Sequence, residues 1–379
     1  MRERIIVKGR PGKKGRWSPA FQVSYWLMKN DSIGRIIDAN INRVTEALRV
    51  AEDLCRFHWD FQGFARELKG LRHEVFEILF PPGSRREEIL RYRDIEGDVG
   101  RDSPSPPRGS ADPPSLAFSN LQRAKEALRT LEEACRIDRP EAAARLEKVR
   151  YHLYAVEKGL GHLSRGSSLR ARLAEVRLYL LAGSSLTARP LHEVVAEALS
   201  AGVGAVQLRE KTLPDRKILL LARRLREETA RAGALFLVND RPDIALSSSA
   251  DGVHLGQGDL PPAEARAIIG EEGIVGISTH SLEQARAAER EGADYIGFGP
   301  LYPTTTKGAG PVVGPSELTR ILPEVSIPAF AIGGIRPENI GAVAAAGGRR
   351  AAISCAAFSA GDVGATVKAL LAGLARGAS

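Results

Sequence analysis

The chain has 379 residues, 43% of them hydrophobic, and a formal net charge of +8. That length predicts about two or three domains, and that composition excludes a disordered protein. The longest apolar runs are only strand-length, which excludes a membrane-spanning helix, and the three scattered cysteines are typical of reduced thiols in a cytoplasmic protein.

The positive charge is concentrated at the N-terminus. Residues 1–16 contain seven lysines and arginines against one glutamate, so the rest of the chain is near neutral. We interpret residues 1–31 as a basic, disordered tail and expect neither a nucleic-acid nor a membrane partner, although such a tail is able to touch either. Met1 and Met28 are the only methionines, and because the predicted structure begins just after Met28, either one is a candidate for the start of translation.

An internal repeat follows this tail. The segment Asn40–Arg56 is echoed 80 residues later by Asn120–Arg136, and both copies have helical composition without Gly or Pro. At 100° per residue, each copy has an apolar stripe. Glu52 is expected on the opposite face, in solvent, whereas the polar residues on the shoulder of each stripe need a partner or a ligand. The shoulder residues are Asn40, Arg43 and Glu46, with Asn120 and Arg123 at the equivalent positions of the second copy.

The repeats belong to a predicted helical domain over residues 32–160, with further helices at 61–80 and 140–159. Between the repeats, Asp94, Glu96 and Asp98 alternate in a glycine-containing loop that suits Mg²⁺. Residues 161–175, rich in Gly, Ser and Arg, are interpreted as a linker.

Strands alternate with helices from residue 176 to residue 379. This pattern predicts an α/β fold, a (β/α)8 TIM barrel following the N-terminal all-α domain, with a doubly wound open sheet as the alternative. The predicted strands are 177–182, 204–208, 234–238, 251–254, 274–278, 293–298, 328–332 and 350–354. The predicted helices are 190–201, 214–231, 261–269, 281–291, 314–321, 336–345 and 361–375.

The ends of strands 2 to 4 carry charged residues. Side chains alternate along a strand, so Gln207, Arg209 and Lys211 are expected to point to the same side. Two cations would then lie close together, as the binding of a pyrophosphate requires. The alternative is a series of surface ion pairs with Glu210. Asp240 and Asp259 follow the next two strands, and with a pyrophosphate they would complete an oxygen shell for Mg²⁺. Asp240 alone also suits a helix N-cap.

The ends of strands 6 to 8 suit a second phosphate. Strand 6 runs into a loop of glycine, prolines, three threonines and Lys307, and glycines follow strand 7. Small residues, hydroxyl groups and one cation are typical of a phosphate site, although a polar turn is the simpler interpretation of the loop alone. His254, on strand 4, is expected to be a packed residue rather than a catalyst.

Five motifs together resemble the thiamine-phosphate synthase family over residues 176–375. They are Gln207–Lys211, Asn239-Asp240, Gly256–Asp259, Gly299–Lys307 and Ile332–Gly334. The resemblance implies that a pyrimidine diphosphate joins thiazole phosphate with release of pyrophosphate. It assigns the pyrimidine diphosphate to Gln207, Leu208, Arg209, Glu210, Lys211, Asn239, Ser278 and Lys307. It assigns Mg²⁺ to Asp240 and Asp259, and thiazole phosphate to Thr304, Thr305, Thr306, Gly334, Ile353 and Ser354.

The implied reaction is a dissociative displacement. Arg209, Lys211 and Lys307 would stabilise the departing pyrophosphate, with Ser278 also counted among the catalytic groups. One departure from the family pattern is the pair Arg349-Arg350, which precedes strand 8 and puts Ile353 and Ser354 in doubt.

The N-terminal half resembles the second type of hydroxymethylpyrimidine phosphate kinase, through Asp38–Arg43 and Arg93–Gly100. This resemblance implies ATP as a co-substrate and a site drawn from Asn40, Arg43, Asn120, Arg123, Asp94 and Asp98. Alternatively, the asparagines cap helices and the arginines pair with Glu46 and Glu126. Two readings of the whole chain stay open beside a bifunctional enzyme: a synthase with a dimerising helical domain, which leaves a homo-oligomer open, and a thiazole-processing isomerase.

Overall fold

The computed structural model describes residues 31–82, 87–90, 92–93, 112–187, 189–304, 311–354 and 361–376. The chain divides into two compact units between Gly161 and His162. The first is all-helical and the second is a closed parallel barrel of eight strands with surrounding helices, so the predicted fold class is confirmed. The expected basic tail lies almost wholly outside the described residues.

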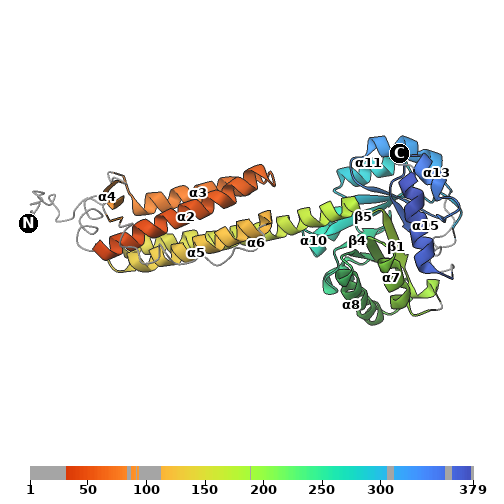
Figure 1. Ribbon diagram of the computed structural model, residues 1–379, viewed down its shortest axis with the longest axis horizontal. Coiled ribbons are helices and arrows are strands. Elements are labelled where there is room, and N and C mark those ends of the chain that lie inside the picture. The colour runs from red at the N-terminus through yellow and green to blue at the C-terminus, as the bar shows by residue number, and fades with distance from the viewer. Residues whose placement is uncertain are drawn as a thin grey trace, which may run out of the picture. The chain divides into compact units, whose positions relative to one another are not determined.

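The first unit is a bundle of long helices around one apolar core (Figure 1). Helix α2 packs against both α3 and α5, and the two repeats form α2 and α5. The apolar stripe of each repeat is buried; Val44, Leu48, Leu121 and Leu128 are fully inaccessible. The bounds are α2 Asp31–Phe57, α3 Gln62–Leu79, α4 Glu87–Leu90, α5 Pro113–Arg136 and α6 Pro140–Glu175.

The repeat also places a buried ion pair in each half of the bundle. Glu52 is 5% exposed and accepts from Arg72 Nη2 of α3 at 3.0 Å. Its counterpart Glu132 is fully buried and accepts from Arg150 Nε of α6 at 3.0 Å. The expectation that Glu52 faces solvent was wrong, because a second helix covers that face of each repeat and supplies an arginine.

The segment 161–175 is helical rather than an irregular linker. It continues α6 to Glu175, and its leucines and arginines have good helix propensity despite Gly161 and Gly166. Leu169 and Leu173 are buried in a cluster with side chains from the barrel interior. This burial explains why the segment stays helical.

The strands of the second unit pair in sequence order, and β1 closes the ring by pairing with β8. All eight strands lie where the apolar runs predicted them. In the register, Tyr179 of β1 lies opposite both Ala205 and Ala352. The strands are β1 Leu178–Ala182, β2 Ala205–Leu208, β3 Leu235–Asn239, β4 Gly252–Leu255, β5 Ile274–Thr279, β6 Tyr295–Phe298, β7 Ala329–Ile332 and β8 Ala351–Ile353.

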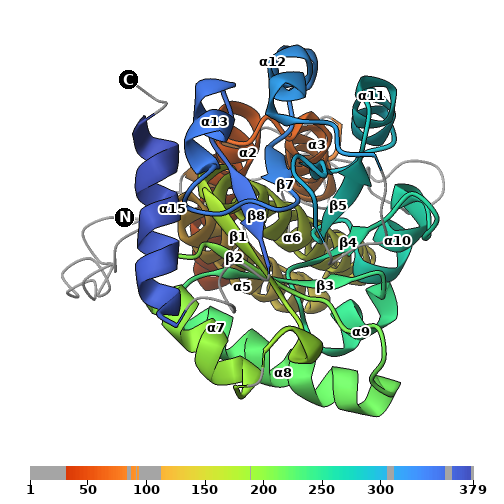
Figure 2. The same cartoon turned by 90° about the vertical axis from the view of Figure 1, so that its right-hand side faces the viewer.

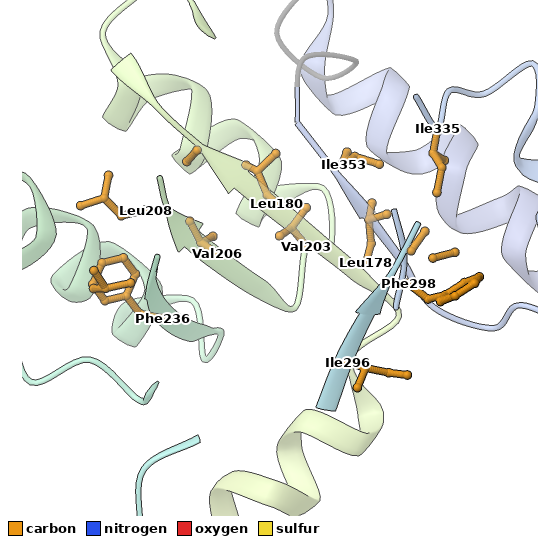
Figure 3. Packing of buried hydrophobic residues seen from close by; sticks show 14 of the residues in the cluster. Leu178, Leu180, Val203, Val206, Leu208, Phe236, Ile296, Phe298, Ile335 and Ile353 are labelled. Carbon is orange, nitrogen blue, oxygen red and sulfur yellow. The ribbon is translucent and has the colours of Figure 1, made fainter. Parts of the chain in front are cut away.

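Helices surround these strands, as Figure 2 shows. Alternate strand residues point outward and form the apolar layer between strands and helices, including Leu180, Val206, Phe236 and Phe298 (Figure 3). The helices are α7 Leu191–Ser200, α8 Asp215–Arg231, α9 Pro242–Ser247, α10 Pro262–Ile269, α11 Leu282–Arg290, α12 Leu318–Ile321, α13 Ile340–Ala345 and α15 Val363–Arg376. Short 3₁₀ turns are η1 Ser184–Leu186, η2 Pro315–Glu317 and η3 Leu322–Glu324.

The other strand residues fill the barrel interior. Tyr179, Tyr295 and Phe330 pack edge to face there, with ring centroids 5.5 to 5.9 Å apart. Gly276 makes room for this cluster, because a Cβ built on it would lie 2.0 Å from the Tyr295 ring. The interior is therefore a packed core, and the loops at the carboxyl ends of the strands are left to form the site.

Candidate active site at the carboxyl ends of the barrel strands

Gln207 lies inside the barrel near the end of β2. Its side chain is 1% exposed, and Nε2 donates to the Tyr179 hydroxyl at 2.7 Å. Its Oε1 atom is buried and has no hydrogen-bond partner in the described part of the protein. A buried acceptor without a partner is costly, so this oxygen suits a ligand donor.

Glu210 has a different partner from the one that an ion-pair ladder requires. Its carboxylate accepts from the backbone N–H and the hydroxyl group of Ser184, at the start of the turn after β1. The ladder interpretation of residues 207–211 was therefore wrong. Glu210 holds the turn after β1 and is not the partner of either neighbouring cation.

Lys211 forms an ion pair with Asp240, across the ends of β2 and β3. Asp240 has a φ of 61°, a left-handed conformation that costs free energy for a residue other than glycine. It is not a helix cap, since α9 begins at Pro242 and Arg241 is its N-cap residue. The N-cap interpretation was therefore wrong.

Asp259 is hydrogen-bonded to Asp240, and its Oδ2 atom accepts from the Gly256 N–H at 2.7 Å. Burial raises the pKa of the Asp259 carboxyl, and the hydrogen bond and charge of Asp240 raise it further. Burial also raises the pKa of Asp240, but hydrogen bonds with Lys211 and Asp259 and the charges of Lys211 and Arg209 bring it below its ordinary value. The two carboxyls thus behave as a pair that prefers to hold one proton or one cation.

This pair fits a magnesium ion. Two adjacent carboxylates are the oxygen donors that Mg²⁺ prefers, and a cation between them would relieve their repulsion. Within the described ranges, no group of three or more His, Cys, Asp or Glu side chains has metal-binding geometry. Asp240 and Asp259 would therefore hold the ion together with oxygen atoms of a substrate.

Ser278 and Asn239 lie beside this pair in the ring of strands. Asn239 ends β3 and is in register with His254 of β4. His254 is 6% exposed, and its Nε2 lies 3.0 Å from the Ser278 hydroxyl of β5. Its Nδ1 lies 2.9 Å from the Tyr295 hydroxyl, so the expectation of a packed histidine is confirmed.

The predicted thiazole phosphate corner is only partly described. Thr305, Thr306 and Lys307 lie outside the described residues. Gly334 has a φ of 63°, and a Cβ there would lie 2.6 Å from the Pro303 carbonyl oxygen, so the chain needs glycine where it passes the loop after β6. Thr304 and Ser354 are described and half-buried.

Two of the residues that the resemblance assigns to substrate binding have side chains that point away from the carboxyl-end opening of the barrel. Leu208 and Ile353 are buried in the outer layer, between strands and helices. Any contact of these residues with a substrate would come from their backbone groups. Figure 3 shows both side chains in that apolar layer.

Arg349 and Arg350 lie at the amino end of β8, opposite the predicted phosphate corner. Arg350 Nη2 donates to the Ala174 carbonyl near the end of α6 at 2.5 Å. A cation is favourable there because the last carbonyl groups of a helix lack partners within the helix. Arg350, the second arginine of this departure from the family pattern, therefore caps α6 at the amino end of β8.

In the helical unit, the two shoulder asparagines have matching geometry. Asn40 Nδ2 donates to the Ile36 carbonyl and Asn120 Nδ2 to the Leu116 carbonyl, each at 2.8 Å. Both lie inside helices, so the capping alternative was wrong. Arg43 and Arg123 are exposed, and Arg43 donates to Asn40 Oδ1 at 3.4 Å.

Asp38 ties the loop after α4 to α2. Its carboxylate accepts two hydrogen bonds from Arg93, each 2.9 Å long. Asp94 and Asp98, the first and fifth residues after Arg93, lie outside the described residues. Asp38 is one helical turn from Asn42, whose amide donates to the Asp38 carbonyl at 3.0 Å.

Sequence reasoning missed the buried partners of the predicted site residues. Tyr179, Tyr295 and His254 connect Gln207 to Ser278, and Asp38 anchors Arg93. The signal was available in part, because a polar residue inside an apolar strand requires a partner. Which partner it meets depends on the closure of the barrel.

Comparisons with known proteins agree with both halves of this description. Residues 178–357 match the family model described as thiamine monophosphate synthase, and residues 35–159 match the model of the ThiD2 family. A thiamine-phosphate synthase of Gloeobacter violaceus is 41% identical over 352 residues, covering 93% of this chain and 99% of that protein. One from a Synechocystis strain is 41% identical over 323 residues, covering 85% and 90%.

Among solved structures, thiamine phosphate pyrophosphorylase from Pyrococcus furiosus is similar to the barrel. It is 36% identical with a TM-score of 0.50, and the match covers 56% of this chain and all of that one. Both resemblances read from the motifs are confirmed at the level of family. Among the residues that the structure describes, none of the helices combines the length and apolar character needed to cross a membrane.

Proposed function

Because the chain belongs to the thiamine-phosphate synthase family, we propose that its barrel joins 4-amino-2-methyl-5-(diphosphooxymethyl)pyrimidine to 4-methyl-5-(2-phosphoethyl)thiazole, forming thiamine phosphate and pyrophosphate. The observation that carries this proposal is the cluster of Lys211, Asp240 and Asp259 at the ends of β2 to β4. Two carboxylates beside a lysine suit a magnesium-bound diphosphate. A bound Mg²⁺ would neutralise charge on the leaving pyrophosphate.

Other residues of the barrel bind and orient the two substrates. Arg209 and Lys211 attract the diphosphate and stabilise the negative charge that develops as it leaves. Gln207 and Ser278 orient the pyrimidine, while Thr304, Gly334 and Ser354 position the thiazole phosphate. Holding both substrates in one pocket makes the attack of the thiazole nitrogen effectively unimolecular.

The test supplies both substrates and Mg²⁺ to the purified full-length protein. Thiamine phosphate and pyrophosphate should appear in equal amounts, and neither should form without the thiazole. An isomerase that processes the thiazole alone would change that compound without the pyrimidine and would release no pyrophosphate. That result would overturn the proposal.

We also propose that the helical unit phosphorylates the pyrimidine monophosphate with ATP, which would make the enzyme bifunctional. The match to the ThiD2 family and the paired geometry of Asn40 and Asn120 support this second activity. The exposed guanidinium groups of Arg43 and Arg123 suit phosphate groups. Asp94 and Asp98 follow Arg93 in the chain and are proposed as Mg²⁺ ligands on the chemistry of their carboxylates alone.

The kinase proposal is tested in the full chain by following diphosphate formation from the monophosphate and Mg-ATP. Arg43→Ala and Arg123→Ala should each slow this step at least about tenfold, the value of one charge-assisted hydrogen bond. Arg56→Ala is the matched control, because Arg56 is exposed on α2 and lies over the Phe57 ring. Unchanged phosphorylation in both variants would contradict the kinase proposal and leave the repeats a structural role. Synthase activity, measured with the pyrimidine diphosphate supplied, shows separately whether the barrel of each variant is intact.

A further inference from the structure

Two adjacent glycines, Gly333 and Gly334, form the turn that follows β7. Both have left-handed backbone angles, with φ values of 96° and 63°. A Cβ on Gly333 would lie 2.5 Å from the Pro300 Cα atom, so the turn packs directly against the loop after β6. Glycine has more conformational freedom than any other residue, so a turn built from two glycines holds one conformation only if other groups fix it.

The loop after β6 fixes the first peptide group of this turn. The Tyr302 N–H donates to the Gly333 carbonyl at 3.0 Å, and the Leu301 N–H donates to the Ile332 carbonyl at 2.9 Å. The Gly333 carbonyl shares a planar trans peptide group with the Gly334 N–H, so that N–H points away from Tyr302. An anion at Gly334 would meet this N–H, because glycine has no side chain and its carbonyl oxygen would repel a negative charge.

Asn339 fixes the second peptide group of the turn. Its Nδ2 donates to the Gly334 carbonyl at 2.9 Å, and its Oδ1 accepts from the Arg336 N–H at 2.8 Å. The Asn339 carbonyl accepts from the Tyr302 hydroxyl at 3.2 Å. Burial raises the pKa of Tyr302, so its hydroxyl group stays a neutral donor. One half-buried asparagine therefore connects the turn after β7 to the loop after β6.

Asn339 is the N-cap residue of α13, but its side chain does not cap that helix. Asparagine is favoured at an N-cap because its side-chain oxygen accepts from N–H groups in the first turn of the helix. Here the oxygen accepts instead from Arg336, three residues before Asn339. The side chain thus serves the turn that precedes the helix rather than the helix itself.

We infer that Asn339 is a positioning residue that holds the Gly334 N–H in place for a phosphate group, with support from Tyr302. The inference rests on the proposed synthase function for the identity of this phosphate, the one carried by the thiazole. The geometry does not rest on that function, because every contact described above lies within the protein. Thr304, which the resemblance also assigns to thiazole phosphate, follows Tyr302 by two residues, so the same contacts join both loops assigned to this substrate.

The variant Asn339→Asp separates positioning from capping. Aspartate is as good an N-cap residue as asparagine and keeps an acceptor for the Arg336 N–H. It loses the donor to Gly334 and places a carboxylate against the Gly334 carbonyl oxygen, so the turn should loosen. Ser248→Ala is the matched control. It removes another side-chain hydrogen bond to a backbone carbonyl, from the buried Ser248 hydroxyl to Ile244 at 2.7 Å, in the segment that precedes β4 at the amino end of the barrel.

The first experiment needs no substrate. The full-length protein is labelled with ¹⁵N-tyrosine, and the amide signal of Tyr302 among the seven tyrosines is identified as the one missing from Tyr302→Phe. Asn339→Asp should speed hydrogen exchange of the Tyr302 N–H about tenfold, the value of one hydrogen bond, whereas Ser248→Ala should leave the exchange rate unchanged. A wild-type exchange rate in Asn339→Asp is what a capping role predicts, and it would overturn the inference.

The second experiment measures steady-state kinetics with the same proteins. Asn339→Asp should raise the KM for thiazole phosphate about tenfold, with little change in kcat or in the KM for the pyrimidine diphosphate. Tyr302→Phe should raise the same KM by less, because it keeps the N–H bond to Gly333. Its control is Tyr151→Phe, since Tyr151 lies exposed on α6. Equal rises in both KM values would indicate a general loosening of the barrel and would overturn the inference.

The two experiments separate a failure of this inference from a failure of the synthase proposal. If the wild-type protein forms no thiamine phosphate, the synthase proposal fails, and the exchange rates still decide whether Asn339 fixes the turn. If exchange accelerates in Asn339→Asp while the KM for thiazole phosphate stays unchanged, the Gly334 N–H does not hold that phosphate and the inference fails.

Discussion

Lys211 and Asp240 form an ion pair that joins the ends of β2 and β3. Asp259 is hydrogen-bonded to the same aspartate from the loop after β4. Asp240 therefore contacts the Lys211 ammonium on one side and the Asp259 carboxyl on the other. A metal ion, a proton and the Lys211 ammonium all compete for these carboxylate oxygens. The affinity for the metal ion should therefore change with pH and with removal of the ammonium.

Magnesium binding should depend on pH through Asp259. Its pKa is raised, so the proton competes with the metal over a range above the ordinary carboxyl pKa, and the apparent affinity should rise with pH through that range. Lys211→Met removes a charge that lowers the pKa, so the rise should move to higher pH. At pH values above this rise, the variant should bind Mg²⁺ more tightly than the wild type, because no ammonium competes for the carboxylate oxygens. Calorimetric titration checks this, and identical pH profiles would contradict it.

The Asp259 carboxylate should be essential to the synthase reaction. Asp259→Asn keeps the size of the side chain but removes its charge, so turnover should fall about a hundredfold or more at saturating substrates. Asp243→Asn is the matched control, because Asp243 pairs with Arg241 and is exposed. Circular dichroism should show both variants folded. Normal turnover of Asp259→Asn at limiting Mg²⁺ would remove this residue from the metal site.

Gly334 should matter to the thiazole substrate. Gly334→Ala puts a Cβ against the Pro303 carbonyl at a φ of 63°, so the loop after β6 must shift. We expect a higher KM for thiazole phosphate with little change in the KM for the pyrimidine. Gly347→Ala is the control, because Gly347 has a φ of 86° but precedes β8 at the other end of the barrel. Equal effects of both changes would indicate backbone strain rather than a binding role.

The buried pair in the helical unit should contribute to stability. Glu132→Leu removes the carboxylate that buried Arg150 shares with Arg129 and Arg136, and should lower the free energy of unfolding by about 3–5 kcal/mol. The double variant Glu132→Leu with Arg150→Met replaces both buried charges by apolar groups and should recover most of that loss, because the more exposed Arg129 and Arg136 keep Glu133 as a partner. Denaturant unfolding of the full chain, followed by helical signal, measures both. A double variant as unstable as the single one would show that the pair is not the cause.

The sequence alone determined the eight strands of the barrel and the chemistry at their ends. Short apolar runs alternating with helices specify parallel strands that helices cover on both faces, a pattern that fits a doubly wound open sheet as well as the closed barrel that the structure has. The polar residues at the ends of these runs then fall at one end of the barrel, since the strands are parallel. Arg209, Lys211, Asp240 and Asp259 could therefore be assigned from their positions in the chain.

Only the tertiary structure decided which of these groups meet. Gln207 and Ser278 are connected by hydrogen bonds through three side chains of the barrel interior, Tyr179, Tyr295 and His254. The two tyrosines are 116 positions apart in the chain and meet because the register of the closed barrel sets their positions along its axis. Glu52 looked solvent-exposed on its own helix but is buried, because α3 covers that face and supplies Arg72. Residues 161–175 looked like a linker but continue α6, because Leu169 and Leu173 find an apolar surface in the barrel interior. A local pattern specifies how a segment folds, whereas the partners of its polar groups depend on surfaces contributed by distant parts of the chain.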